Sequence, residues 1–187
     1  AVATLPLTVD GPDAPPPSPQ AELPLVVYGD DAGRDAPYAP SGWMGEVGAI
    51  AMDAADTSNP ALGATSLRVD YRTGGGWGGV VWQSPAGDWG DRPGGLDLSG
   101  AQVLSVWARG ARGGERVTFL VGLLGPDKPF HDSARRTLEV TLGVRWQRYF
   151  IDLRGLDLSA IKTAFGWTVT GQGEPLTFFL DEVRFER

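Results

Sequence analysis

The tryptophans Trp77, Trp82 and Trp89 stand close together in this chain, among the glycines of residues 74–79 and near acidic, amide and arginine side chains. Flat indole rings stack on the apolar faces of sugar rings, while carboxylates and amides hydrogen-bond the hydroxyls at the ring edge. A glycine-rich backbone also lets another molecule approach closely. The segment therefore predicts a surface that binds a polysaccharide or oligosaccharide, and it does not by itself indicate a catalyst.

The predicted sugar contacts fall into a stacking group and a polar group. The stacking group is Trp43, Trp77, Trp82 and Trp89, and the polar group is Gln83, Asp88, Asp91 and Arg92. Trp43, Trp77 and Trp89 have glycine-rich, loop-like neighbours, where a large apolar side chain either folds over the core or faces a ligand. Trp82 shares a strand face with Val80, so it belongs to the core unless that face is the one that binds ligand. For the polar group the alternative is ordinary solvation in a loop.

Two other functions stay open at this point. A glycoside hydrolase needs two carboxylates that flank one bond, and the loop acids that would have to converge are Asp88, Asp91, Asp127, Asp132 and Glu174. The single histidine, His131, has no nucleophile motif or second histidine beside it, and we expect it at the surface. We assign no catalytic residue and expect a binding module. The first alternative is a glycoside hydrolase or polysaccharide lyase, and the second is a protein–protein or cell-surface assembly module.

Composition limits the partners. The chain has 187 residues, a formal net charge of -7 at pH 7 and no cysteine, so it has no disulfide and no thiolate metal site. A nucleic-acid partner needs a basic patch, and the densest basic spot is only Arg135-Arg136, so we expect no nucleic acid. No apolar run approaches the ~20 residues of a membrane helix, so we expect no membrane insertion. A neutral ligand fits the charge best, although a locally basic groove for an acidic glycan stays open.

Residues 1–22 are rich in proline and predict a linker or tether ahead of a compact domain over residues 23–187. The prolines are Pro6, Pro12, Pro15, Pro16, Pro17 and Pro19. Such a segment favours extended polyproline II and acts as a spacer between modules of one polypeptide. Other modules of the same polypeptide are therefore further expected partners. The segment has two alternatives: a plain flexible terminus, or an edge strand built on Val2, Leu5, Leu7 and Val9. The first four residues are compatible with an end left by signal cleavage, so we expect a secreted protein.

The elements that position these residues are predicted to be short strands. Apolar or alternating runs between turn residues predict strands at 25–28, 47–52, 66–71, 79–83, 103–108, 117–124, 137–142, 147–152, 164–169 and 177–185. Only residues 158–161 suggest a single helical turn, with Asp157 as its cap. Trp167 shares its strand face with Phe165 and Val169 and is predicted to pack in the core. So many short strands separated by turns indicate an all-β sandwich or jelly roll.

The order of several motifs adds a family resemblance. The motifs are Asp97-Leu98-Ser99-Gly100, Leu104-Ser105-Val106-Trp107-Ala108, Trp146-Gln147-Arg148-Tyr149-Phe150 and Leu180-Asp181-Glu182-Val183. Over about residues 25–187 the chain resembles the galactose-binding-like jelly-roll domains that include carbohydrate-binding modules of bacterial secreted, carbohydrate-active proteins. The resemblance implies a jelly-roll β-sandwich of two antiparallel sheets, one of them concave. It also implies a ligand site on the concave face or in the loops at one edge. Trp107 and Trp146 lie in the framework motifs of the resemblance and are therefore expected to pack.

The same resemblance implies a structural calcium ion. The matching positions are Asp30, Asp31, Asp53, Asp56, Asn59 and Asp181. Calcium takes six to eight oxygen ligands, and carboxylates and an amide are suitable chemistry. Relatives often supply a glutamate from the first strand, whereas Gly29-Asp30-Asp31 stands there in this chain, so the ligand set stays open. The alternative is that these residues cap turns at the surface.

Overall fold

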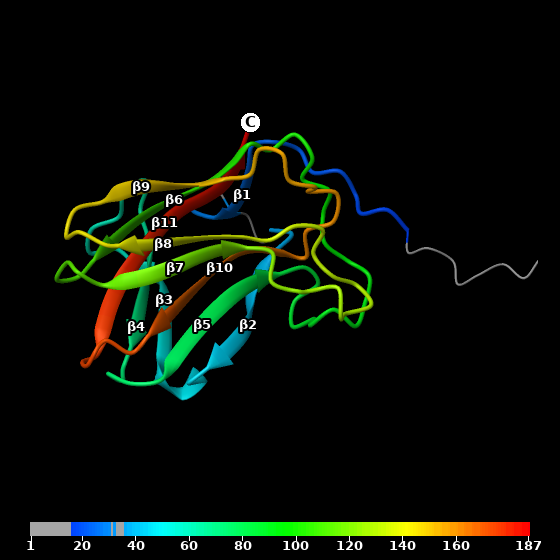
Figure 1. Ribbon diagram of the computed structural model, residues 1–187. Coiled ribbons are helices and arrows are strands. Elements are labelled where there is room, and N and C mark those ends of the chain that lie inside the picture. Colours follow the sequence, from blue (N-terminus) through cyan, green and yellow to red (C-terminus); the bar gives the residue numbers. More distant parts are fainter. Residues whose placement is uncertain (1–15, 31, 33–35) are drawn as a thin grey trace, which may run out of the picture.

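The chain folds as two antiparallel β-sheets packed face to face (Figure 1), as the computed structural model shows for residues 16–30, 32 and 36–187. The six-stranded sheet contains β1 (Leu25–Tyr28), β3 (Ile50–Asp56), β4 (Ser66–Tyr71), β6 (Val103–Gly110), β9 (Gln147–Asp152) and β11 (Leu176–Glu186). Its strand order is β3-β4-β11-β6-β9, with β1 also pairing with β11. The five-stranded sheet contains β2 (Ala39–Gly45), β5 (Trp77–Gln83), β7 (Arg116–Val121), β8 (Arg136–Thr141) and β10 (Thr163–Thr170). Its order is β2-β5-β10-β7-β8. The predicted all-β sandwich is confirmed.

Most predicted strands are present, and three local predictions are corrected. Strand β2 was not predicted, because Pro40 and the glycines at 42 and 45 look like a loop. It is an edge strand with a bulge between Pro40 and Gly42, which is where a sheet tolerates proline. The predicted strand at 47–52 begins as the 3₁₀ helix η1 (Val47–Ala49) and becomes extended only at Ile50. No helical turn forms at residues 158–161, where Ile161 instead pairs with Leu96.

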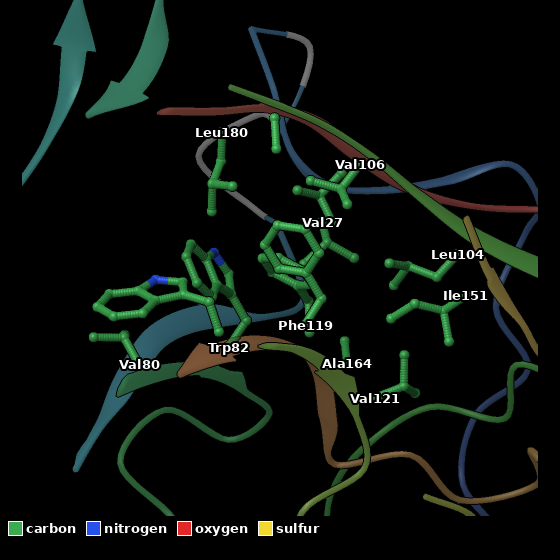
Figure 2. Close-up of a cluster of buried hydrophobic side chains, with 14 of the residues drawn as sticks. Val27, Val80, Trp82, Leu104, Val106, Phe119, Val121, Ile151, Ala164 and Leu180 are labelled. Atoms are coloured by element: carbon green, nitrogen blue, oxygen red, sulfur yellow. The ribbon is translucent and has the colours of Figure 1, made fainter. Parts of the chain in front are cut away.

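The core lies between the sheets and is built from alternate residues of the central strands. Val80 and Trp82 of β5 point inward, as do Phe165 of β10 and Phe119 of β7, and they belong to one buried cluster. Figure 2 shows Val80, Trp82 and Phe119 of this sheet in one cluster with side chains of the opposite sheet, such as Leu180. The rings of Trp82 and Phe165 have centroids 5.3 Å apart. Aromatic pairs at this separation add to the stabilisation that burial itself provides.

The described end of the predicted tether lies along the domain. The amide of Ala21 donates to the carbonyl of Asp97 (2.8 Å), and the amide of Asp97 donates to the carbonyl of Pro19 (2.8 Å). Gln20 therefore pairs in parallel with Asp97. Residues 1–15 of the predicted tether lie outside the described residues. No helix found in the described chain is long and apolar enough to cross a membrane.

We predict that Trp82→Ala lowers the free energy of unfolding by about 3–5 kcal/mol, because it leaves a cavity beside Phe165 in the core. Trp77→Ala, at a side chain that is 48% exposed, should cost no more than about 1 kcal/mol. Urea denaturation followed by circular dichroism measures both values. Equal losses in the two variants would contradict this placement of the two indoles.

Candidate functional site

The outward-pointing residues of the five-stranded sheet form two rows that run across its strands. The first row follows the strand register from β2 to β8 through Met44, Gly79, Thr168, Thr118 and Glu139. The second row runs parallel to the first and is displaced from it by two residues on each strand. It contains Trp77 opposite Thr170, and Arg116 opposite Thr141. We call these the transverse rows. They place one exposed indole beside several hydroxyl groups and two charged groups on a single sheet face.

A polar recess lies at the β7–β8 side of the transverse rows. It has a volume of about 490 Å³, and its lining includes Arg116, Thr118, Glu139, Thr141, Thr170 and Gln172. The Gln172 amide is fixed to the backbone of Arg116, accepting from its N–H (3.0 Å) and donating to its carbonyl (2.9 Å). The recess therefore offers hydroxyl, carboxylate and guanidinium groups to a ligand rich in hydroxyls.

Loops cover the next row of the same face. Val81 and Leu120 point outward, yet they are only 0% and 3% exposed. The chain after β5 is held over this row, because Gln83 Nε2 donates to the carbonyl of Asp88 (2.8 Å). The loop after β7 packs against it, and the amide of Phe130 donates to the carbonyl of Gly90 (3.0 Å). Residues 84–95 and 122–135 thus form a loop wall along one side of the transverse rows.

A network of buried charges holds the loop wall. Lys162 and Asp88 form an ion pair in which both side chains are nearly inaccessible to solvent. The Asp88 carboxylate also accepts from the amides of Gly90, Asp91 and Arg92. Burial alone would raise the pKa of Asp88, but the hydrogen bond and charge of Lys162 outweigh it, so the pKa is lowered and the carboxylate stays ionised.

Asp132 is the second buried acid of this network. Its two carboxylate oxygens accept from four backbone amides, those of Leu123, Leu124, Lys162 and Thr163. These bonds join the loop after β7 to the start of β10. Both Asp132 oxygens are therefore occupied by backbone amides. A catalytic carboxylate would need at least one oxygen free to face the substrate. Glu174, another of the acids considered for catalysis, pairs with Arg112 (2.9 Å) at the opposite end of the sheet.

Three of the predicted sugar contacts are buried, so their prediction as surface contacts is wrong. Trp82 lies in the core on the face of Val80 (2% exposed), so it offers no surface for a sugar ring. Gln83 is 1% exposed and is bonded to Asp88 and Ser41. Asp88 is 3% exposed and serves the loop wall. The three residues are close to Trp77 in the sequence. Strand alternation turns Trp82 toward the core, and the loop after β5 folds back over the sheet and buries Gln83 and Asp88.

The remaining predicted contacts do not form one platform. Trp43 lies on β2 and pairs with the core residue Val80, so its side chain leaves the sheet on the side opposite to Trp77. It is 39% exposed because β2 is an edge strand. Trp89 is half-buried in the loop wall, where Asp91 and Arg92 are exposed. Trp77, Trp89, Asp91 and Arg92 are therefore the predicted contacts that still border the outer face.

The structure also adds residues that the sequence reasoning missed. The threonines Thr118, Thr168 and Thr170 alternate with buried apolar residues along β7 and β10. That alternation was visible in the sequence, but threonine is common in strands and has no distinctive chemical signature. Among the tryptophans predicted to pack, Trp167 is buried in the core. Trp107 instead lies on the outer face of the six-stranded sheet, opposite Asp181 and Arg148.

The acids predicted to bind calcium act as loop anchors. Asp30 accepts from the amide of Ala64, and Asp181 accepts from the amides of Ala61 (2.9 Å) and Leu62 (3.1 Å). Burial raises the pKa of Asp181, and the charge of Asp30 raises it further against the effect of these amides. The other predicted ligands lie in β3 or in the loop after it. Asp53 and Asp56 accept from nearby backbone amides and so cap turns. The backbone carbonyl of Asn59 accepts from the indole N–H of Trp146.

These acids do not assemble around one point. Among the described residues no three acidic or histidine side chains are placed to share an ion, and Asp31 lies outside the described part. The oxygens of Asp30 and Asp181 already face backbone amides, which are not what a cation site presents. In this arrangement the donor set does not fit the implied site.

We predict that Asp181→Ala lowers the free energy of unfolding by about 1–3 kcal/mol, because two loop amides lose their acceptor. Asp53→Ala, which removes only an exposed turn cap, should change it by no more than about 1 kcal/mol. Urea denaturation at pH 7 gives both values. A loss at Asp53 as large as that at Asp181 would refute the role of Asp181 as the loop anchor.

Sequence comparisons identify no relative. No protein-family model matches the chain, and no curated protein matches it.

Solved structures share the fold. The family 30 carbohydrate-binding module of a cellulosomal cellulase of Clostridium thermocellum is 18% identical with a TM-score of 0.62, covering 88% of this chain and 97% of that one. The family 11 module from Clostridium thermocellum, in complex with a β-1,3-1,4-mixed-linked tetrasaccharide, is 14% identical with a TM-score of 0.58, covering 86% and 94%. The chain has the β-sandwich fold of these carbohydrate-binding modules.

Proposed function

We propose that this domain binds a polysaccharide or oligosaccharide without cleaving it, on the outer face of the five-stranded sheet. The observation that carries the proposal is the position of Trp77, which is 48% exposed and lies in the second transverse row opposite Thr170. An exposed indole beside convergent hydroxyl and charged groups is the surface that a sugar chain requires.

The dimensions of the face suit an extended ligand. Neighbouring strands lie ~4.8 Å apart, so the rows from β2 to β8 span about 19 Å, enough for several sugar units. Trp77 stacks on one ring, and the hydroxyls of Thr168, Thr118 and Thr170 meet the next units. Such contacts are individually weak, so we expect millimolar to micromolar dissociation constants, about 4–8 kcal/mol of binding free energy.

The structural neighbours support this function. They are named as binding modules, and the family 11 module is described in complex with a tetrasaccharide. The burial of Asp88 and Asp132 removes two of the acids on which the catalytic alternative depended. The cellulosomal origin of the neighbours also favours an extracellular bacterial protein that is attached to other modules, as we expect from the proline-rich segment.

The test is a titration of intrinsic tryptophan fluorescence with a panel of soluble glycans. We predict a saturable change with one glycan class in the wild type, and at least tenfold weaker binding in Trp77→Ala, because loss of the stacking ring costs more than ~1.4 kcal/mol. Isothermal titration calorimetry confirms the affinity of the variant, which has lost one reporter indole.

Trp43→Ala is the matched control, since it removes an indole of similar exposure from the other side of the sheet. Its affinity should stay within about threefold of the wild type. If Trp43→Ala loses binding and Trp77→Ala keeps it, the site has been placed on the wrong face. If the wild type binds no glycan at all, the assembly function replaces this proposal.

The predicted calcium ion is tested separately by thermal unfolding. A ligand that binds only the folded state raises the melting temperature with its concentration. Since Asp30 and Asp181 already face amides, we expect equal melting temperatures in calcium and in chelator. A rise in calcium that Asp181→Asn abolishes would show that the two acids rearrange around an ion.

A further inference from the structure

We infer that Lys162, a side chain with almost no accessible surface, is a positioning residue that sets the glycan selectivity of the outer face by holding the loop wall. The inference rests on the proposed function, and it concerns which sugar chains fit. Trp77 provides one contact surface, whereas the wall limits how much room lies beside the bound chain.

Lys162 joins the two parts of the wall to the sheet. It directly precedes β10, and its ammonium group donates to the Asp88 carboxylate and to the carbonyl of Arg92, both in the loop after β5. Its own amide donates to Asp132 in the loop after β7 (2.6 Å). The ammonium group also lies 5.7 Å from the ring centroid of Phe130. One residue therefore contacts both loops.

One side of these loops faces a cavity and not the packed domain. A cavity of about 570 Å³ lies against them, lined in part by Pro93, Pro129, Phe130 and Lys162, and by the prolines of residues 16–19. On the side of this cavity the loops have fewer close contacts to hold them in place. The buried ion pair supplies the missing restraint, since a buried charge that loses its partner has a strong tendency to reach solvent.

The position of the wall has a consequence for the ligand. The transverse rows are open above Thr168 and Thr118, whereas the adjacent row is covered at Val81 and Leu120. A linear chain lies along the rows, but a side branch on the wall side meets residues 84–95. Steric exclusion of this kind is how a binding site rejects a competitor that shares its main contacts. The wild type should therefore prefer unbranched chains.

The experiment measures affinities by calorimetry for a linear β-glucan hexasaccharide and for the same backbone carrying single-sugar branches. We expect the wild type to favour the linear chain by about tenfold. In Lys162→Met the ratio should fall to about twofold or less. General destabilisation lowers both affinities together and leaves this ratio unchanged, so the ratio separates positioning from a merely structural role.

Lys128→Met is the matched control, because it makes the same substitution at the other lysine of the chain, in the same wall. Lys128 takes part in none of the salt bridges found among the described residues. Its selectivity ratio should equal that of the wild type. Should Lys162→Met not fold, Arg92→Ala shortens an exposed side chain of the wall and should lower the same ratio.

Hydrogen exchange gives a readout that needs no glycan. The amides of Gly90, Asp91 and Arg92 donate to Asp88, so Lys162→Met should speed their exchange at least tenfold while Lys128→Met leaves it unchanged. Unchanged exchange in Lys162→Met, or a wild type that binds branched and linear chains equally, overturns the inference. A wild type that binds neither chain, although exchange responds as expected, contradicts the proposed function and confines Lys162 to holding the wall.

Discussion

The alternation of side chains along β5 is the constraint on which the rest of the domain depends. This strand lies between β2 and β10, and its odd and even residues serve different purposes. Val80 and Trp82 point into the sandwich and pack in the core, while Trp77 leaves on the opposite side. A shift of one residue in register would exchange these faces. The same register that buries the core therefore exposes the indole.

Buried charge plays a complementary part at the loop end of the sheet. Long loops need partners for their backbone amides. Asp88 and Asp132 accept from seven amides, five in the loops after β5 and β7 and two at Lys162 and Thr163, where β10 begins. Burying two carboxylates is costly unless they are hydrogen-bonded and paired. Lys162 provides the charge partner of Asp88. The acids that resemble catalytic or sugar-binding residues in the sequence are thus used to organise the loops that border the binding face.

The sequence predicted the fold better than the site, for physical reasons that particular residues show. Alternation in β10 identified Trp167 as a core residue, because period-two patterning reflects burial directly. Strand β2 was missed because edge strands tolerate the proline and glycines that elsewhere mark loops. Asp88 and Lys162 are far apart in sequence, and nothing local indicates that they pair. The threonines of the transverse rows were overlooked because their role comes from register across five strands, which no single segment contains.

The most direct test of this account is to map the bound glycan by NMR, following the backbone amide signals during titration with an oligosaccharide that binds. The account predicts the largest shifts at Trp77, Thr118, Thr168 and Glu139, on the four neighbouring strands β5, β10, β7 and β8. Signals of β4, β6 and β11 in the other sheet should move little. Shifts concentrated instead on the outer face of the six-stranded sheet, around Trp107 and Phe150, would contradict the central claim.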